Sequence, residues 1–127
     1  MTDMGTFRID VEVENPFTAS GGVTLHSVLV DTGAELSWFP GSILESLGIE
    51  RRKVWHFRQA NGTVLARWAG WAAVRADNRE TIDEVVFGEP EDLVLLGARS
   101  LEGLNVRVDP VAKVLVDAGP APAAALT

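Results

Sequence analysis

The chain has 127 residues, of which 46% are hydrophobic and 23% are charged, and its formal net charge is −7 at pH 7. This length suits one domain, and the composition excludes a chain that is disordered throughout. The acidic excess argues against a surface that neutralises phosphates, so we expect no nucleic-acid partner.

The sequence contains no cysteine, which excludes disulfides, thiolate metal sites and cysteine nucleophiles. Residues 1–16 mix charged and apolar positions and lack the basic start and unbroken apolar run of a signal peptide. No segment approaches the roughly 18 apolar residues that a membrane span requires. We therefore expect a cytoplasmic protein with no membrane partner.

The N-terminal part of the chain predicts two strands. Residues 7–13 alternate apolar and charged side chains, which is the period of a half-buried antiparallel strand. Turn-forming residues occupy 15–22, and residues 23–31 (VTLHSVLVD) form a second strand that becomes continuously apolar at Val28–Val30. Asp31 therefore lies where a buried strand ends.

Residues 40–49 (PGSILESLGI) predict a short helix. Ser42 would be its N-cap, Glu45 would complete a capping box, and Gly48 would end the helix.

A long hairpin is predicted for residues 54–74. This segment contains Asn61-Gly62 between two strand-like runs, which is the strongest short-range signal for a hairpin. We expect the tip of the hairpin at Ala60, Asn61 and Gly62.

The remaining predicted segments are short. They are a turn at 76–81, a strand at 82–87, a turn at 88–92, a buried strand at 93–97 (LVLLG), a helix at 98–104, strands at 105–110 and 111–117, and an Ala- and Pro-rich tail at 118–127. The predicted fold is all-β: a small closed barrel or sandwich of seven or eight strands with one or two short helices. We expect a domain of residues 1–117 and a flexible tail of residues 118–127.

The tripeptide Asp31-Thr32-Gly33 follows the buried strand. Alone it is weak evidence for a catalytic site, because small polar residues after a strand are ordinary turn chemistry. In this context the sequence resembles the retropepsin-like aspartic proteases, the single-domain retroviral type and its bacterial relatives. LVDTGAELSWF resembles the catalytic strand and loop, RQANGTV the flap tip, and LVLLGARSLEGLNVRVDPVAKVL the second motif, its helix and the closing strands. The resemblance covers roughly residues 7–115.

The resemblance implies a closed β-barrel, a homodimer, an extended peptide or protein substrate, and peptide hydrolysis without a metal or cofactor. Asp31 would be the shared acid and base, and Thr32 would hydrogen-bond across the dimer axis. Gly33 would let the backbone approach its symmetry mate. Ala34 and Glu35 would start the wall of the substrate groove.

The predicted flap consists of Ala60, Asn61 and Gly62. By the same resemblance, it would close over an extended peptide and exclude water, and backbone hydrogen bonds would extend a sheet onto the substrate.

Hydrolysis of an amide by water needs one group that removes a proton from the water and another that protonates the carbonyl oxygen. Two carboxyls that share one proton can do both, and aspartic proteases are the established example of such a pair. Asp31-Thr32-Gly33 is the only Asp-Thr-Gly or Asp-Ser-Gly in the chain. The second carboxyl would therefore be Asp31 of another copy, related by a two-fold axis.

One feature departs from the viral pattern, in which an arginine directly follows the second glycine. Here Gly97 is followed by Ala98 and then by Arg99. Arg99 could serve instead by pairing with Glu35.

A near copy of the first motif, VLVDAGPAP, returns at Val114 to Pro122. Asp117 in this copy is followed by Ala118, which lacks the hydroxyl of Thr32, and Pro120 would prevent the same loop from forming. We interpret Asp117 as structural.

Two other functions remain open. The chain could be a catalytically inactive module of the same fold, used for dimerisation or for binding extended peptides. It could also be an unrelated β-barrel in which Asp-Thr-Gly is accidental. His26 and His56 stand singly, and no cluster has metal-ligand spacing, so we expect no metal site.

Overall fold

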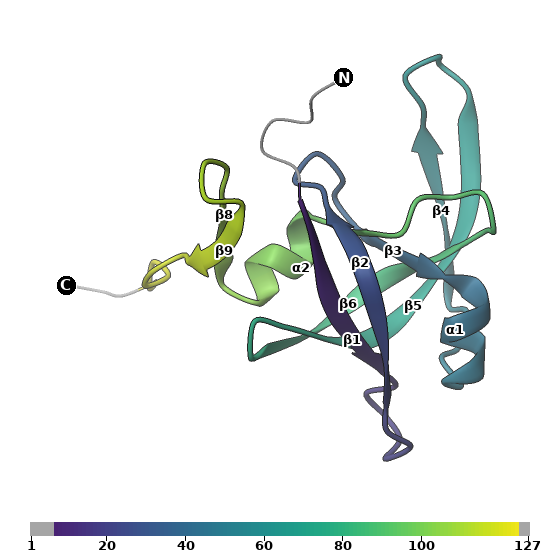
Figure 1. Cartoon of the computed structure of the whole chain (residues 1–127). Coiled ribbons are helices and arrows are strands. Elements are labelled where there is room, and N and C mark those ends of the chain that lie inside the picture. Colours follow the sequence, from purple (N-terminus) through teal and green to yellow (C-terminus); the bar gives the residue numbers. More distant parts are fainter. Residues whose placement is uncertain (1–6, 125–127) are drawn as a thin grey trace.

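A computed structural model describes residues 7–124, and strands dominate its regular structure (Figure 1). Residues 1–6 of the expected domain and residues 125–127 of the expected tail lie outside the described part. The strands are β1 (Arg8–Glu14), β2 (Gly22–Val30), β3 (Ser37–Pro40), β4 (Lys53–Arg58), β5 (Val64–Ala76), β6 (Arg79–Gly88), β7 (Leu95–Leu96), β8 (Val106–Asp109) and β9 (Val114–Asp117). The helices are α1 (Gly41–Ser46) and α2 (Ala98–Gly103).

The larger sheet closes on itself. Its strand order is β1-β2-β7-β3-β6-β5-β4, and β1 also pairs with β5, so the strands from β1 to β5 in this order form a ring and β4 lies outside it. The pairs β2–β7 and β3–β6 are parallel, and the other pairs are antiparallel. The predicted all-β closed fold with two short helices is confirmed. The short strand β3 was not predicted, because its four residues (SWFP) carry no alternation long enough to detect.

The core lies inside the ring. Its fully buried members come from facing strands and from α1, and include Val11, Val13, Val28, Phe39, Leu44, Val74, Val85 and Leu96. The small helices complete the cover, since Leu44 of α1 and Leu101 of α2 belong to the same apolar cluster. Burial of such side chains is the main term that stabilises the ring.

Strand β2 contains a bulge that the sequence did not predict. Leu25 lies opposite Val11 and Val28 lies opposite Ile9, so two residues of β2 stand where β1 has one. Ser27 has a φ of 57°, and its N–H donates to Oδ1 of Asp10 (3.2 Å). This contact satisfies a backbone donor that the bulge removes from the ladder, and backbone hydrogen bonding lowers the pKa of Asp10.

The prediction that Ser42 caps helix α1 is wrong. The N-cap is Pro40, without a side-chain hydrogen bond, because β3 runs directly into the helix and pairs through Pro40 with Gly88. The prediction of a capping box fails with it, and Glu45 instead forms an ion pair with Arg51 (2.6 Å). Gly48 ends the helix as expected, with a φ of 75°.

The C-terminal strands β8 and β9 form a separate two-stranded sheet. The turn between them occupies residues 110–113, so the prediction of a strand that starts at residue 111 is wrong by three residues. Asp109 Oδ1 accepts hydrogen bonds from the N–H groups of Val111 and Ala112 (3.0 and 3.1 Å). This side-chain turn explains why the chain reverses before β9.

In the described part of the chain, no helix has the length and apolar character needed to cross a membrane.

Candidate active site

Asp31 is held by its own loop and by strand β7. Its N–H donates to the Leu96 carbonyl (2.9 Å), which extends the parallel pairing of β2 with β7 by one residue. The Gly33 N–H donates to Oδ1 of Asp31 (2.9 Å), and the Ala34 N–H donates to the Asp31 carbonyl (3.3 Å). A backbone turn therefore orients the carboxyl group, which is only half-buried.

Helix α2 begins directly against the Asp31 loop. The Ala98 N–H donates to the Ala34 carbonyl (2.7 Å). A Cβ on Gly97 would lie 2.5 Å from the Leu36 carbonyl oxygen and 2.9 Å from that of Ala34. Only glycine permits this approach of two backbone segments. The LVLLG stretch thus contributes Leu95 and Leu96 to β7 and its glycine to the contact with the loop.

Two buried serines join the same elements, and the sequence analysis did not identify them. Ser37 and Ser100 are both 0% exposed, and their hydroxyl oxygens are 2.6 Å apart. Ser37 Oγ also accepts a hydrogen bond from the Gly97 N–H (2.9 Å). The position of Ser100 next to Leu101 on the apolar side of the predicted helix was the one signal that it is buried.

The expected pairing of Arg99 with Glu35 is present. Nε and Nη2 of Arg99 donate to Oε2 of Glu35 (3.0 and 2.8 Å), and the Arg99 N–H donates to the Glu35 carbonyl (2.9 Å). Both side chains are substantially exposed, at 41% and 63%, so the ion pair contributes little stability. Its effect is to tie the end of the Asp31 loop to α2.

Arg99 also connects this loop with the hairpin formed by β4 and β5. Its guanidinium carbon lies 5.5 Å from the ring centroid of Trp55 in β4, and Trp55 Nε1 donates to Oε2 of Glu84 (2.9 Å). The rings of Trp38 and Phe57 are 4.8 Å apart and join β3 to β4. The hairpin is thus packed beside the site by aromatic contacts.

The Asp31 loop borders an open cavity of about 440 Å³. Its lining residues are Thr32, Gly33, Ala34, Glu35, Ala98, Arg99 and Glu102. Four of the lining residues are predicted site residues that follow one another in the sequence, and the fold places α2 beside them. Burial raises the pKa of nearby Asp83, while a backbone hydrogen bond and the charge of Arg99 act in the opposite direction.

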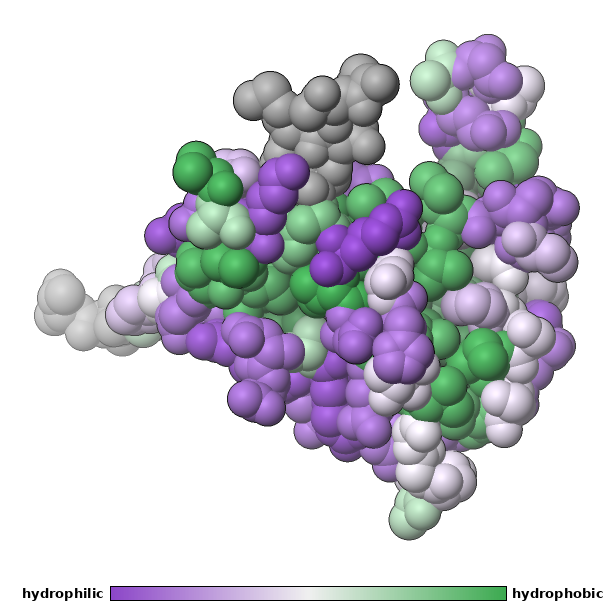
Figure 2. All heavy atoms as spheres, viewed as in Figure 1, coloured by the Kyte–Doolittle hydropathy of each residue, from purple (hydrophilic) through white to green (hydrophobic). Residues whose placement is uncertain are grey.

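The structure places Ala60, Asn61 and Gly62 at the tip of the β4–β5 hairpin, as predicted. The Gly62 N–H donates to the Gln59 carbonyl (2.9 Å), and Gly62 has a φ of 89°, as in a three-residue loop that ends in a left-handed glycine. All three residues are exposed, and the hairpin projects from the ring (Figure 1). Figure 2 shows mainly hydrophilic residues at the end of this hairpin.

Asp117 lies apart from this site, in β9. Its Oδ2 accepts a hydrogen bond from Nη2 of Arg79 (2.8 Å), and its Oδ1 accepts one from the Gly119 N–H (2.6 Å). The Arg79 contact and the backbone bond lower the pKa of Asp117. Both carboxylate oxygens thus have partners within the chain, as expected for a structural residue.

Within residues 7–124, no group of three His, Cys, Asp or Glu side chains is arranged to hold a metal ion. His26 Nδ1 lies 3.2 Å from Oδ2 of Asp10, and both side chains are exposed.

Comparison with solved structures identifies the fold. The EIAV protease complexed with the inhibitor HBY-793 is 17% identical to this chain and matches 80% of it and 90% of its own length, with a TM-score of 0.51. The solution structure of the simian foamy virus (mac) protease is 19% identical over 75% of this chain and 91% of that chain, with a TM-score of 0.49. No family model and no curated protein matches the sequence. The fold is that of the retropepsin-like proteases.

Proposed function

We propose that this chain is an aspartic endopeptidase of the single-domain type shared by retroviruses and bacterial relatives, and that it acts as a homodimer. Asp31 of each copy supplies one carboxyl of the catalytic pair. One carboxyl accepts a proton from the attacking water, while the other donates a proton to the carbonyl oxygen of the scissile peptide bond. The C–N bond of the resulting tetrahedral intermediate then breaks, as the first carboxyl gives its proton to the leaving nitrogen and the second carboxyl takes back a proton from one hydroxyl of the intermediate.

The observation that carries this proposal is the environment of Asp31. A half-buried carboxyl is oriented by the Gly33 N–H at the end of a buried strand, in a fold of the retroviral protease type. A single chain holds one such carboxyl, so the pair requires a second copy. Thr32 and Gly33 are exposed beside Asp31 and remain accessible to that copy.

The central experiment measures cleavage of an unstructured protein at mildly acidic pH. We expect cleavage that a transition-state analogue such as pepstatin blocks and that Asp31→Asn abolishes. Asp117→Asn is the matched control, because Asp117 makes the same turn with Gly119 but lies outside the site. Equal cleavage by Asp31→Asn and the parent protein would refute the assignment.

The shared site has its own test. Mixing the parent protein with an excess of Asp31→Asn chains should reduce cleavage, because mixed dimers hold a single ionisable carboxyl in the pair. The specific rate should also fall on dilution below the dimer dissociation constant. A rate that is proportional to the parent concentration in both experiments would contradict the dimer. A parent protein that dimerises and binds peptides without cleaving them would instead be a non-catalytic module.

A further inference from the structure

The β4–β5 hairpin leaves the ring partway along β5. Residues Ala69–Ala76 of β5 pair with β6, and the last of these pairs joins Ala69 to Val86. Residues Val64–Trp68 pair only with β4. A two-stranded ribbon is marginally stable by itself, so the position of the hairpin depends on contacts at its base.

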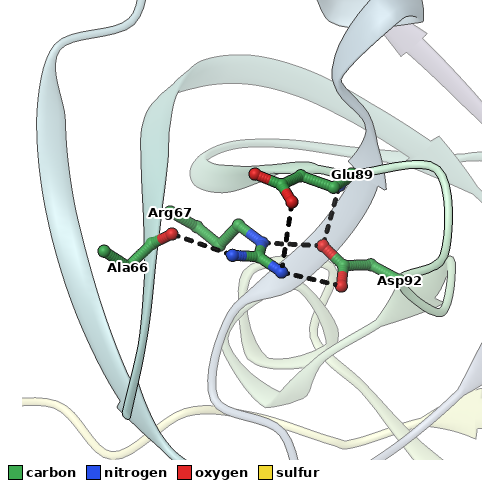
Figure 3. Close-up of polar contacts among 4 residues, drawn as sticks. All are labelled: Ala66, Arg67, Glu89 and Asp92. Carbon is green, nitrogen blue, oxygen red and sulfur yellow. Dashed lines mark hydrogen bonds and ion pairs between the residues drawn. The ribbon is translucent and has the colours of Figure 1, made fainter.

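Arg67 stands at this base, two residues beyond the last pair with β6. Its guanidinium binds Asp92 in two places, with Nε 2.8 Å from Oδ2 and Nη2 3.0 Å from Oδ1 (Figure 3). Nη1 donates to the Ala66 carbonyl (2.9 Å), and Nη2 lies 3.6 Å from Oε1 of Glu89. Every nitrogen of the guanidinium therefore has an acceptor, in the fork geometry that arginine favours.

This ion pair differs from the surface ion pairs of the chain in its burial. The side chains of Arg67 and Asp92 are 11% and 12% exposed, compared with 38% and 54% for Arg51 and Glu45. The hydrogen bonds from Arg67 hold the pKa of Asp92 below its usual range, although burial opposes this shift. Asp92 therefore stays ionised at mildly acidic pH, so the contact persists where the proposed reaction would be measured.

Asp92 also organises the loop that leads to the Asp31 site. Its Oδ2 accepts a hydrogen bond from the Glu89 N–H (2.7 Å), which closes a turn after β6. The loop continues into β7, where Leu95 pairs with Leu29 and the Leu96 carbonyl accepts the Asp31 N–H. The base of the hairpin and the strand that supports Asp31 are thus joined through one short segment.

We propose that Arg67, Asp92 and Glu89 form a clamp that fixes the angle of the β4–β5 hairpin relative to the Asp31 site. These are positioning residues, and the inference on catalysis rests on the proposed function. The clamp restricts how far the hairpin moves away from the site and so increases the share of molecules that are ready to bind a peptide.

Hydrogen exchange tests the clamp without any need for activity. In Arg67→Gln, amides of Lys53–Arg58 and Val64–Trp68 should exchange about tenfold faster, while amides of Ala72–Ala76 change by less than about twofold. Arg67→Lys should lie between the parent and Arg67→Gln, because it keeps the charge and loses the bidentate geometry. Arg52→Gln is the control, since the Arg52 side chain is exposed next to the same hairpin and its one ion pair is a 4.0 Å contact with Glu50, while its backbone bond to Ala69 is kept.

Asp92→Asn provides a second variant in case Arg67→Gln does not fold, and the same local acceleration is expected for it. Equal acceleration in all strands, or none in the hairpin, would overturn the clamp.

Enzyme kinetics tests whether the clamp affects catalysis. With a peptide substrate that the parent cleaves, Arg67→Gln should raise KM about tenfold and change kcat by less than about twofold. A loss confined to kcat would show that the cluster acts on Asp31 rather than on the hairpin, contrary to the proposal. A parent that cleaves no peptide refutes the proposed function, and the exchange result then decides the clamp alone.

Discussion

The hydroxyl of Ser37 has two partners in a fully buried position. It accepts the Gly97 N–H and contacts the hydroxyl of Ser100, so it connects β3, the glycine after β7 and α2. Ser100 in turn has Ser37 as its partner. Loss of the Ser37 hydroxyl would leave both the Gly97 N–H and the Ser100 hydroxyl without a partner, whereas loss of the Ser100 hydroxyl would affect only that of Ser37. Ser37 should therefore contribute more to stability than Ser100.

We predict that Ser37→Ala lowers the free energy of unfolding by about 2–3 kcal/mol and Ser100→Ala by about 1–2 kcal/mol. Urea denaturation monitored by tryptophan fluorescence would measure both. Ser46→Ala is the control, because the Ser46 hydroxyl is exposed and donates only to the Ile43 carbonyl. Its loss should lower the free energy of unfolding by less than about 0.5 kcal/mol. The reverse order of Ser37 and Ser100 would contradict the described network.

At the scale of single residues, the sequence predicted local chemistry better than long-range contacts. The Asp-Thr-Gly turn is local and follows from its residue types. The pairing of Arg99 with Glu35 spans 64 positions, and it was expected only because both residues lie next to recognised motifs. The Ser37–Ser100 contact joins residues 63 positions apart, and serine is common on surfaces, so no local pattern marks it. Asp31 and Asp117 each accept a hydrogen bond from the N–H of the glycine two residues on, so the expectation that Pro120 prevents this turn is wrong. Pro120 lacks the N–H with which Ala34 contacts the Asp31 carbonyl, and the Arg79 contact, which the sequence does not show, also distinguishes Asp117.

Among the elements, β9 connects the C-terminal sheet to the rest of the fold. It covers one edge of β8, and its Asp117 holds Arg79, whose Nη1 also donates to the carbonyls of Leu104 and Asn105 (3.1 and 2.8 Å). Hydrogen bonds continue past β9, since the Ala118 N–H donates to the Asn105 carbonyl (3.0 Å). Asn105 Nδ2 also donates to the Gly119 carbonyl (3.0 Å), so hydrogen bonds to the rest of the chain extend two residues beyond the boundary expected at residue 117.

We predict that a chain ending at Pro120 unfolds with the same free energy as the parent. A chain ending at Lys113 should have a free energy of unfolding that is lower by about 2–4 kcal/mol, because it lacks the partly buried Leu115 and Val116 and the contact of Asp117 with Arg79. Thermal denaturation of the two truncated chains would measure the difference. Equal stability of both chains would show that β9 does not support the ring.

The element boundaries were predicted best at turns in which one position requires a backbone conformation that few residues adopt. The hairpin tip agrees with the structure because Gly62 takes a left-handed conformation that most residues avoid. Helix α1 was misread at its start, since Ser42 matches a capping pattern while the strand before it leaves no room for a cap. Local patterns thus predict turns well and junctions between packed elements poorly.

At the scale of the whole molecule, charged side chains gather where β1 and β5 pair and close the ring. Glu12–Glu14 of β1 pair with Ala73–Arg75 of β5, and Arg75 contacts two carboxylates across this closure and a third, Glu80, in β6. Its Nη1 lies 3.1 Å from Oε1 of Glu12 and 2.5 Å from Oε1 of Glu14, and its Nη2 lies 2.8 Å from Oε2 of Glu80. These carboxylates, chiefly Glu14, raise the pKa of Arg75.

We predict that Arg75→Gln lowers the free energy of unfolding by about 1 kcal/mol at low salt, because three neighbouring carboxylates lose their shared cation. The loss should shrink in about 1 M NaCl, where charges on the surface are screened. Urea denaturation at the two salt concentrations would measure it, with Arg51→Gln as a single exposed pair for comparison. A loss that is independent of salt would show that packing of the arginine side chain matters more than its charge.

The closed all-β architecture was predictable because alternating strands and turn residues recur along the chain. The closure by β1 and β5 was not, because it joins segments about sixty residues apart through a few pairs only.

The bulge at Ser27 absorbs one extra residue in β2 and keeps Asp31 directed away from the core. Leu25 and Asp31 are six residues apart, and in a regular strand two residues an even number apart point to the same side. The bulge places two residues where one would fit, so buried positions move to Val28 and Val30, and Asp31 turns away from the core. Loss of Ser27 would leave a regular strand with Asp31 still directed outward. Related chains that differ in length by one residue at this point can therefore carry the same site.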